Sequence, residues 1–157
     1  MKVRIVRKSA SYAVAVVNEL LVISIARGQP ITHDAEIQGT TIRQIVEQNP
    51  GTCAWLCYIE PSSPKPSDDF QSKVNQMLEA VGPKLGAAAY VIEGKGARNV
   101  FVRMIMTRMT LIRGVPQATK YFEDAKGAEA WLRNTISFPT TISVQEAVKE
   151  VQSAMTA

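Results

Sequence analysis

The sequence predicts an α/β (α+β) protein, with a mixed β-sheet, about four helices and an extra C-terminal amphipathic helix. Three short segments at residues 2–8, 12–17 and 20–26 are predicted as strands, and they lie close enough together to form an antiparallel meander. Continuous apolar segments at 52–59 and 87–93 are typical of strands covered on both faces. From the third strand onward, helical patterns alternate with strands, which favours a sheet with helices packed against it.

The length and composition are those of one globular domain. The chain has 157 residues, of which 46% are hydrophobic and 20% are charged, enough for a substantial core. No apolar segment approaches the ~18 residues that a membrane span needs, and the N-terminus alternates with polar residues instead of forming the apolar part of a signal peptide. We therefore expect a cytoplasmic protein with no membrane span.

The net charge of +4 is modest, and the basic residues are scattered, with no run of five or more. Nucleic-acid-binding proteins usually gather their basic residues on one face or stripe. The charge pattern therefore argues against a nucleic-acid partner.

The first strand and first helix carry recognisable end signals. Lysines and arginines alternate with apolar residues in 2–8, which suits an edge strand because charged side chains discourage edge-to-edge pairing. Thr32 is predicted as the N-cap of a helix with Asp34 in its first turn, where a carboxylate is favourable. Gly39 weakens the middle of this helix, and the Asn-Pro-Gly sequence at 49–51 is predicted to end it.

Three later helices have clear starting residues. Ser67 is predicted to cap a helix that ends at Gly82, and Asp124 to cap a helix that follows a short strand at 118–123. Ser143 begins a Ser-x-x-Glu capping box that opens the last helix. The first and last of these helices have apolar stripes, formed by Phe70, Val74, Met77, Leu78 and Val81 and by Val144, Ala147, Val148, Val151 and Met155.

Two cysteines, Cys53 and Cys57, lie in the apolar segment before the proline-rich loop. In a strand they would share a face about 13 Å apart, too far for a disulfide. His33 is the single histidine, and no second ligand pair accompanies the cysteines. The pattern favours small buried thiols in a reducing compartment, with neither a metal nor a cofactor.

The segment around which the chain is organised is a strand, a glycine turn and an apolar helix at 97–113. Its apolar side chains cover well over half of the helix circumference, whereas a surface helix normally buries about a third. This helix needs a cover on a second side, from the last helix of the chain or from another copy of the chain.

The closing part of the sequence resembles a known family. A glycine-turned strand and helix (VIEGKGARNVFVRMIMTRM) precede a short strand with a phenylalanine, an acidic turn and the sequence Ala-Glu-Ala-Trp-Leu at 128–132. This resembles the SpoIIAA-like members of the STAS superfamily (sulfate transporter and anti-sigma factor antagonist). The resemblance implies a STAS-like order of elements over residues 1–134 and a fold that mostly serves in protein binding or ligand sensing. Residues 135–157 are expected to form a helical extension packed on the same domain or on a partner subunit.

In the anti-sigma factor antagonists, a serine in an Asp-Ser-Ser-Gly type motif is phosphorylated to break a partner complex. The equivalent stretch here is Glu-Pro-Ser-Ser-Pro at 60–64, which makes Ser62 and Ser63 the candidates for a partner or phosphorylation loop. A proline replaces the glycine of the motif, and further loop residues precede the helix.

The leading functional hypothesis is a binding or regulatory module that engages a protein partner or self-associates, for example as a homodimer. The alternative is a carrier or sensor of a small apolar or lipid ligand under the helix at 97–113, where methionines could line an adaptable pocket. The candidate pocket or interface residues are Phe101, Met104, Ile105 and Met109.

A third hypothesis places an anion at the glycine turn, because a helix N-terminus offers free N–H groups to a phosphate. Its candidate residues are Gly94, Lys95, Gly96 and Arg98, although the sequence lacks a complete phosphate-binding fingerprint. No acid, base and nucleophile can be placed together, so we do not expect an enzyme.

Overall fold

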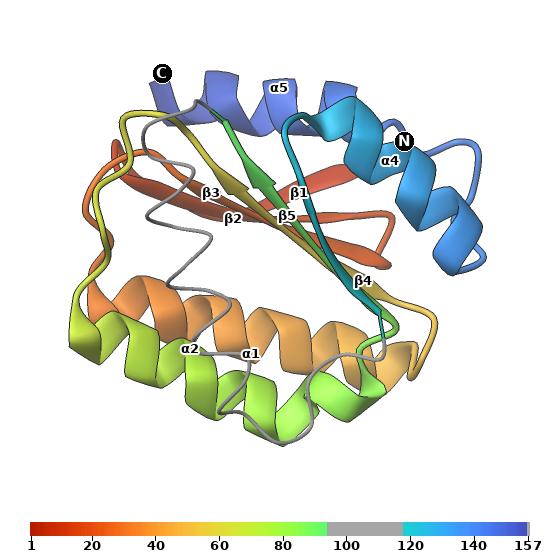
Figure 1. Ribbon diagram of the computed structural model, residues 1–157, viewed down its shortest axis with the longest axis horizontal. Coiled ribbons are helices and arrows are strands. Elements are labelled where there is room, and N and C mark those ends of the chain that lie inside the picture. The colour runs from red at the N-terminus through yellow and green to blue at the C-terminus, as the bar shows by residue number, and fades with distance from the viewer. Residues whose placement is uncertain (94–117, 157) are drawn as a thin grey trace.

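Six strands form one mixed sheet in the order β1-β2-β3-β4-β5-β6, and the computed structural model describes residues 1–93 and 118–156 (Figure 1). The first three strands are antiparallel, and β3 to β6 run parallel. The predicted fold class and the N-terminal meander are therefore confirmed. The strands are β1 (Val3–Lys8), β2 (Tyr12–Val17), β3 (Leu21–Ala26), β4 (Ala54–Ile59), β5 (Ala87–Ile92) and β6 (Thr119–Phe122).

Helices cover both faces of this sheet. Helices α1 and α2 lie on one face, and α4 and α5 lie on the other (Figure 1). Along β4, Leu56 and Tyr58 face one cluster while Trp55 faces the other, as expected for a doubly covered strand. The helices are α1 (Thr32–Gln48), α2 (Asp68–Val81), which continues into the 3₁₀ turn η1 (Gly82–Lys84), α4 (Ala125–Thr135) and α5 (Val144–Thr156).

The start of α1 differs from the prediction. Ile31, not Thr32, occupies the N-cap position, and the Asp34 carboxylate accepts the Ile31 N–H at 2.8 Å. Asp34 also pairs with Arg7 of β1. The helix continues through Gly39, where a side chain would meet the Met77 side chain of α2 at 3.3 Å. Glycine at this position allows the two helices to approach closely.

The predicted caps of the other helices are present. The Ser67 and Asp124 side chains accept backbone N–H groups at the starts of α2 and α4. Ser143 Oγ accepts the Glu146 N–H at 3.3 Å, which is the first half of the predicted capping box. The two serines and Asp124 thus fix where three of the helices begin.

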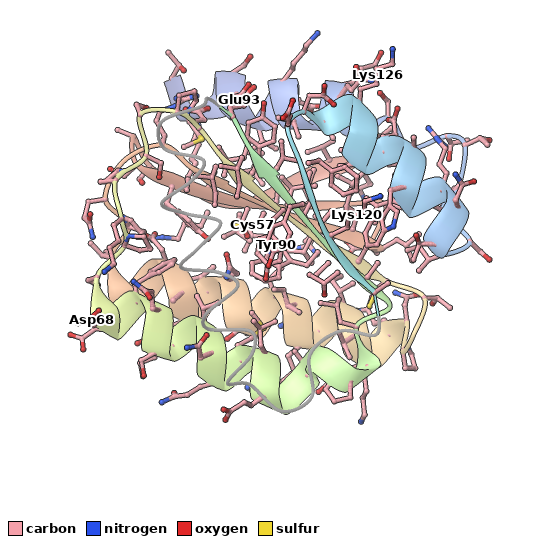
Figure 2. All side chains as sticks on the ribbon, in the orientation of Figure 1. Cys57, Asp68, Tyr90, Glu93, Lys120 and Lys126 are labelled. Atoms are coloured by element: carbon pink, nitrogen blue, oxygen red, sulfur yellow. The ribbon has the colours of Figure 1, made fainter. Side chains whose placement is uncertain are left out.

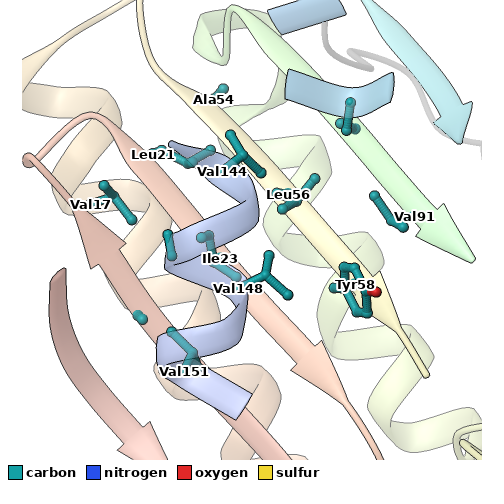
Figure 3. Close-up of a cluster of buried hydrophobic side chains, with 14 of the residues drawn as sticks. Val17, Leu21, Ile23, Ala54, Leu56, Tyr58, Val91, Val144, Val148 and Val151 are labelled. Atoms are coloured by element: carbon teal, nitrogen blue, oxygen red, sulfur yellow. The ribbon is translucent and has the colours of Figure 1, made fainter. Parts of the chain in front are cut away.

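Helix α5 packs directly on the sheet. Its side chains Val144, Val148 and Val151 point toward the strands and join Leu21 and Ile23 of β3 in one buried cluster (Figure 3). The apolar stripe predicted for this helix therefore packs against the strands. Whether α5 also covers residues 97–113 lies outside the described residues.

Candidate functional site at the carboxyl edge of the parallel strands

Three parallel strands end at the same edge of the sheet, and each is followed by a polar or charged residue. Ala26, Ile59 and Ile92 are aligned across β3, β4 and β5. The next residues in the sequence are Arg27, Glu60 and Glu93. The carboxyl ends of parallel strands are where ligands and partners of open α/β sheets most often bind.

Arg27 and Glu60 form a two-pronged ion pair at this edge. Arg27 Nε donates to Glu60 Oε1 at 2.7 Å, and Nη2 donates to Oε2 at 3.1 Å. Burial opposes ionisation of Glu60, but hydrogen bonds from Arg27 and Gln152 outweigh it and hold the pKa of this carboxyl below its usual value. Both side chains are therefore charged at neutral pH.

The same ion pair holds the C-terminal end of α5. Gln152 Nε2 donates to Glu60 Oε2 at 2.8 Å, and Arg27 Nη1 donates to Thr156 Oγ1 at 3.2 Å. Because Gln152 and Thr156 lie in the last two turns of α5, the strand ends and this helix share one polar network. The network consists of Arg27, Glu60, Gln152 and Thr156, and we call it the edge network.

Tyr58 and Glu93 form a second polar contact near this edge. Burial raises the pKa of the Tyr58 hydroxyl, and its hydrogen bond to Glu93 raises it further. Tyr58 is therefore a neutral donor to the Glu93 carboxylate.

The two candidate serines have different environments. Ser62 is exposed, and its Oγ donates to the Arg27 backbone oxygen at 3.3 Å. Ser63 is only 6% exposed, and its N–H donates to the Glu60 backbone oxygen at 3.0 Å. The structure places both serines beside the edge network, and it leaves Ser62 as the accessible one.

Sequence reasoning did not single out Arg27, Glu60 and Gln152. Two of them immediately follow predicted strands, a position that could have marked them. Gln152 has no such signal, because its contact with Glu60 joins residues far apart in the sequence.

The other candidate residues lie outside the described part of the chain. The anion-binding candidates are Gly94, Lys95, Gly96 and Arg98, and the apolar candidates are Phe101, Met104, Ile105 and Met109. Both hypotheses stay predictions.

Within residues 1–93 and 118–156, no group of three or more His, Cys, Asp or Glu side chains is arranged to hold a metal ion. The two cysteines are free thiols. Cys53 is buried, as predicted, whereas Cys57 keeps part of its surface accessible. Among the helices described, none combines the length and apolarity needed to cross a membrane.

Comparison with protein-family models, with curated proteins and with solved structures gave no match. The resemblance to the SpoIIAA-like family therefore rests on the sequence pattern alone.

Proposed function

We propose that this chain is a non-catalytic binding and regulatory module that engages a protein partner through the loop after β4. The observation that carries the proposal is the position of Ser62. It is exposed on a proline-rich loop and is hydrogen-bonded to Arg27, the residue that pairs with Glu60 and contacts α5. A partner bound to this loop would be in reach of a network that connects three elements of the fold.

Phosphorylation of Ser62 would act on the same network. A phosphate adds about −1.5 to −2 charges at neutral pH and several strong hydrogen-bond acceptors. It would repel the Glu60 carboxylate and compete with it for Arg27. A phosphate that draws the Arg27 side chain away from Glu60 would also draw it away from Thr156 of α5, so the loop and the end of α5 would change together.

The test is site-specific photocrosslinking in the cells that express the protein. A benzoylphenylalanine replaces Ser62 in one variant and Glu47 in the control, because Glu47 is exposed near the C-terminal end of α1, away from the carboxyl edge. We expect a discrete protein adduct from position 62 and none from position 47. Equal adducts from both positions, or none from position 62, would refute the proposal.

Self-association is tested separately by light scattering of the purified chain. A mass of twice the monomer would identify the partner as a second copy. A strict monomer at all concentrations would restrict the proposal to a different protein.

A further inference from the structure

The first strand, β1, forms one outer side of the sheet. It is the outermost strand in the order and pairs with β2. Helices α1 and α5 contact β1 from the two faces of the sheet, and no strand of the described residues lies on its outer side. All six residues of β1 keep accessible surface, whereas every residue of β2 is buried. An outer strand of this kind presents unpaired backbone groups to which another strand can bind.

The pairing of β1 with β2 shows which backbone groups of β1 face outward. The Asn18 N–H donates to the Lys2 backbone oxygen at 2.9 Å, so these two facing residues form a hydrogen-bonded pair. In an antiparallel ladder such pairs alternate with pairs whose N–H and C=O groups point away from the partner strand. Val3 and Ile5 occupy positions of the second kind. Their N–H and C=O groups therefore point away from β2, to the outer side of the sheet.

These outward groups have no partner in the part of the chain that the structure describes. Within residues 1–93 and 118–156, no hydrogen bond from outside the β1–β2 ladder reaches the backbone of Val3 or Ile5. Val3 and Ile5 are two positions apart, which is the spacing at which an added strand forms its backbone hydrogen bonds. The register shifts between Ile5 and Arg7, so the regular part of the strand ends at Ile5. The outer side of β1 is therefore a short site for one extended segment.

The net charge of the protein originates in this strand and the residue before it. Residues 1–18 contain four basic residues, Lys2, Arg4, Arg7 and Lys8, and no acidic residue. All 14 acidic residues follow residue 18, together with 14 of the 18 basic residues, so the remainder of the chain is balanced. The net charge of +4 is therefore that of the β1 segment.

Two of these four basic residues already have acidic partners. Arg4 pairs with Glu19 at 2.8 Å, and Arg7 pairs with Asp34 of α1. Lys2 and Lys8 are exposed, and neither forms a salt bridge within the described residues. Two exposed lysines therefore flank the outward backbone groups of β1.

The charges decide which kind of segment can pair with β1. A second copy of β1 would bring lysines and arginines close to one another, and like charges on facing strands are destabilising. An acidic segment would place carboxylates beside Lys2 and Lys8, and opposite charges on facing strands are stabilising. A nucleic acid would match the charge, but it has no peptide backbone to pair with β1. The combination of backbone groups and positive charge therefore favours an acidic polypeptide.

The outermost strand on the other side of the sheet, β6, differs in length and charge. It has four residues, and its one charged residue is Lys120 (Figure 2). The Lys120 ammonium lies over the Phe122 ring, 5.7 Å from its centroid. Lys120 is exposed like the lysines of the β1 segment, which makes it a matched control for them.

We propose that the outer side of β1 binds an acidic, extended segment of another protein by strand addition. The N–H and C=O groups of Val3 and Ile5 pair with the backbone of the segment, and its carboxylates lie beside Lys2 and Lys8. The proposal does not depend on the loop interface at Ser62.

The test uses a blocked synthetic peptide, acetyl-Glu-Val-Thr-Val-Thr-Val-Glu-amide, and the same peptide with lysine in place of both glutamates. Each is titrated into the isotope-labelled full chain while amide hydrogen exchange is followed by NMR. We expect the acidic peptide to slow exchange of the Val3 and Ile5 amides several-fold, because they gain hydrogen bonds. The Arg4 amide, which is already paired with β2, should not change, and the lysine peptide should have no effect.

Three results would overturn the proposal. The first is the absence of protection at Val3 and Ile5, or equal protection by the two peptides. The second is protection that rises with protein concentration without any peptide, which would identify a second copy of the chain as the occupant. The third is equal protection by a single-stranded oligodeoxythymidine, which would show that charge alone is recognised.

Variants identify the contacts. A protein with both Lys2→Glu and Lys8→Glu should lose protection by the acidic peptide and gain protection by the lysine peptide, whereas Lys120→Glu should leave both titrations unchanged. Val3→Pro removes one outward N–H and no hydrogen bond of the β1–β2 ladder, so it should weaken binding of the acidic peptide. Acidic-peptide protection that survives in the double variant, or that is lost in Lys120→Glu, would contradict the assignment.

Discussion

Replacing Arg27 by methionine tests the edge network directly. The change keeps a long apolar side chain but removes the cation from Glu60, whose side chain is only 12% exposed. Glu60 would keep the Gln152 hydrogen bond and lose both Arg27 hydrogen bonds. Hydrogen bonds to charged groups contribute about 1.5–3 kcal/mol, so we expect the free energy of unfolding at pH 7 to fall by about 2 kcal/mol.

The pH dependence gives this prediction a definite sign. In the native protein the pKa of Glu60 is lowered, so the stabilisation is present above the unfolded-state value of about 4.3 and is lost as the pH falls through the folded-state value. In Arg27→Met, burial dominates and the pKa of Glu60 rises. As the pH falls, protonation of Glu60 therefore removes the cost of burying an unpaired carboxylate. The stability difference between the two proteins should therefore shrink between pH 7 and about pH 4.5.

The assay is urea unfolding followed by circular dichroism at several pH values. The control is Arg4→Met, because the Arg4–Glu19 pair is 45% and 46% exposed and such pairs contribute less than about 1 kcal/mol. Equal stability losses in the two variants, or a difference that grows on acidification, would refute the reasoning.

Three further predictions concern the interior. Gly86→Ala should destabilise the protein by about 3 kcal/mol in urea unfolding, because the added carbon would lie 2.4 Å from the Gly51 backbone oxygen; a near-neutral change would show that this approach is looser than described. Leu132→Ala should cost about 3–5 kcal/mol, since Leu132 is 0% exposed within the core on the α4 and α5 face, and a loss below about 1 kcal/mol would contradict that packing. Cys57, with a thiol pKa of about 12, should have a thiolate fraction on the order of 10⁻⁴ at pH 8 and should therefore react slowly with iodoacetamide. The reaction rate should rise about tenfold per pH unit. Fast, pH-independent labelling of the folded protein would show that the thiol has a different environment.

The strands and most helix ends could be predicted because their signals are local. The continuous apolar segments predicted two doubly covered strands, and the structure places Leu56 and Trp55 of β4 in opposite clusters. Ser67 and Asp124 were identified as caps because a cap bonds to a backbone N–H only three residues away.

The features that sequence reasoning missed depend on tertiary contacts. Asp34 was expected only to favour the first turn of α1, yet it also pairs with Arg7 of β1, a contact between distant parts of the sequence. Gly39 predicted a weak point in α1, whereas in the structure the absence of a side chain at Gly39 leaves room for the Met77 side chain of α2. The edge network joins Glu60 to Gln152, and no local pattern indicates that these two side chains meet.

The central claim is that the Ser62 loop and the end of α5 are coupled through Arg27 and Glu60. Hydrogen exchange of the amides at residues 150–156 measures this coupling in Ser62→Asp and Ser62→Ala. A carboxylate at position 62 should compete for Arg27, weaken its contact with Thr156 and speed exchange at these amides several-fold. The alanine variant should exchange like the native protein. Identical exchange in Ser62→Asp and Ser62→Ala would contradict the claim.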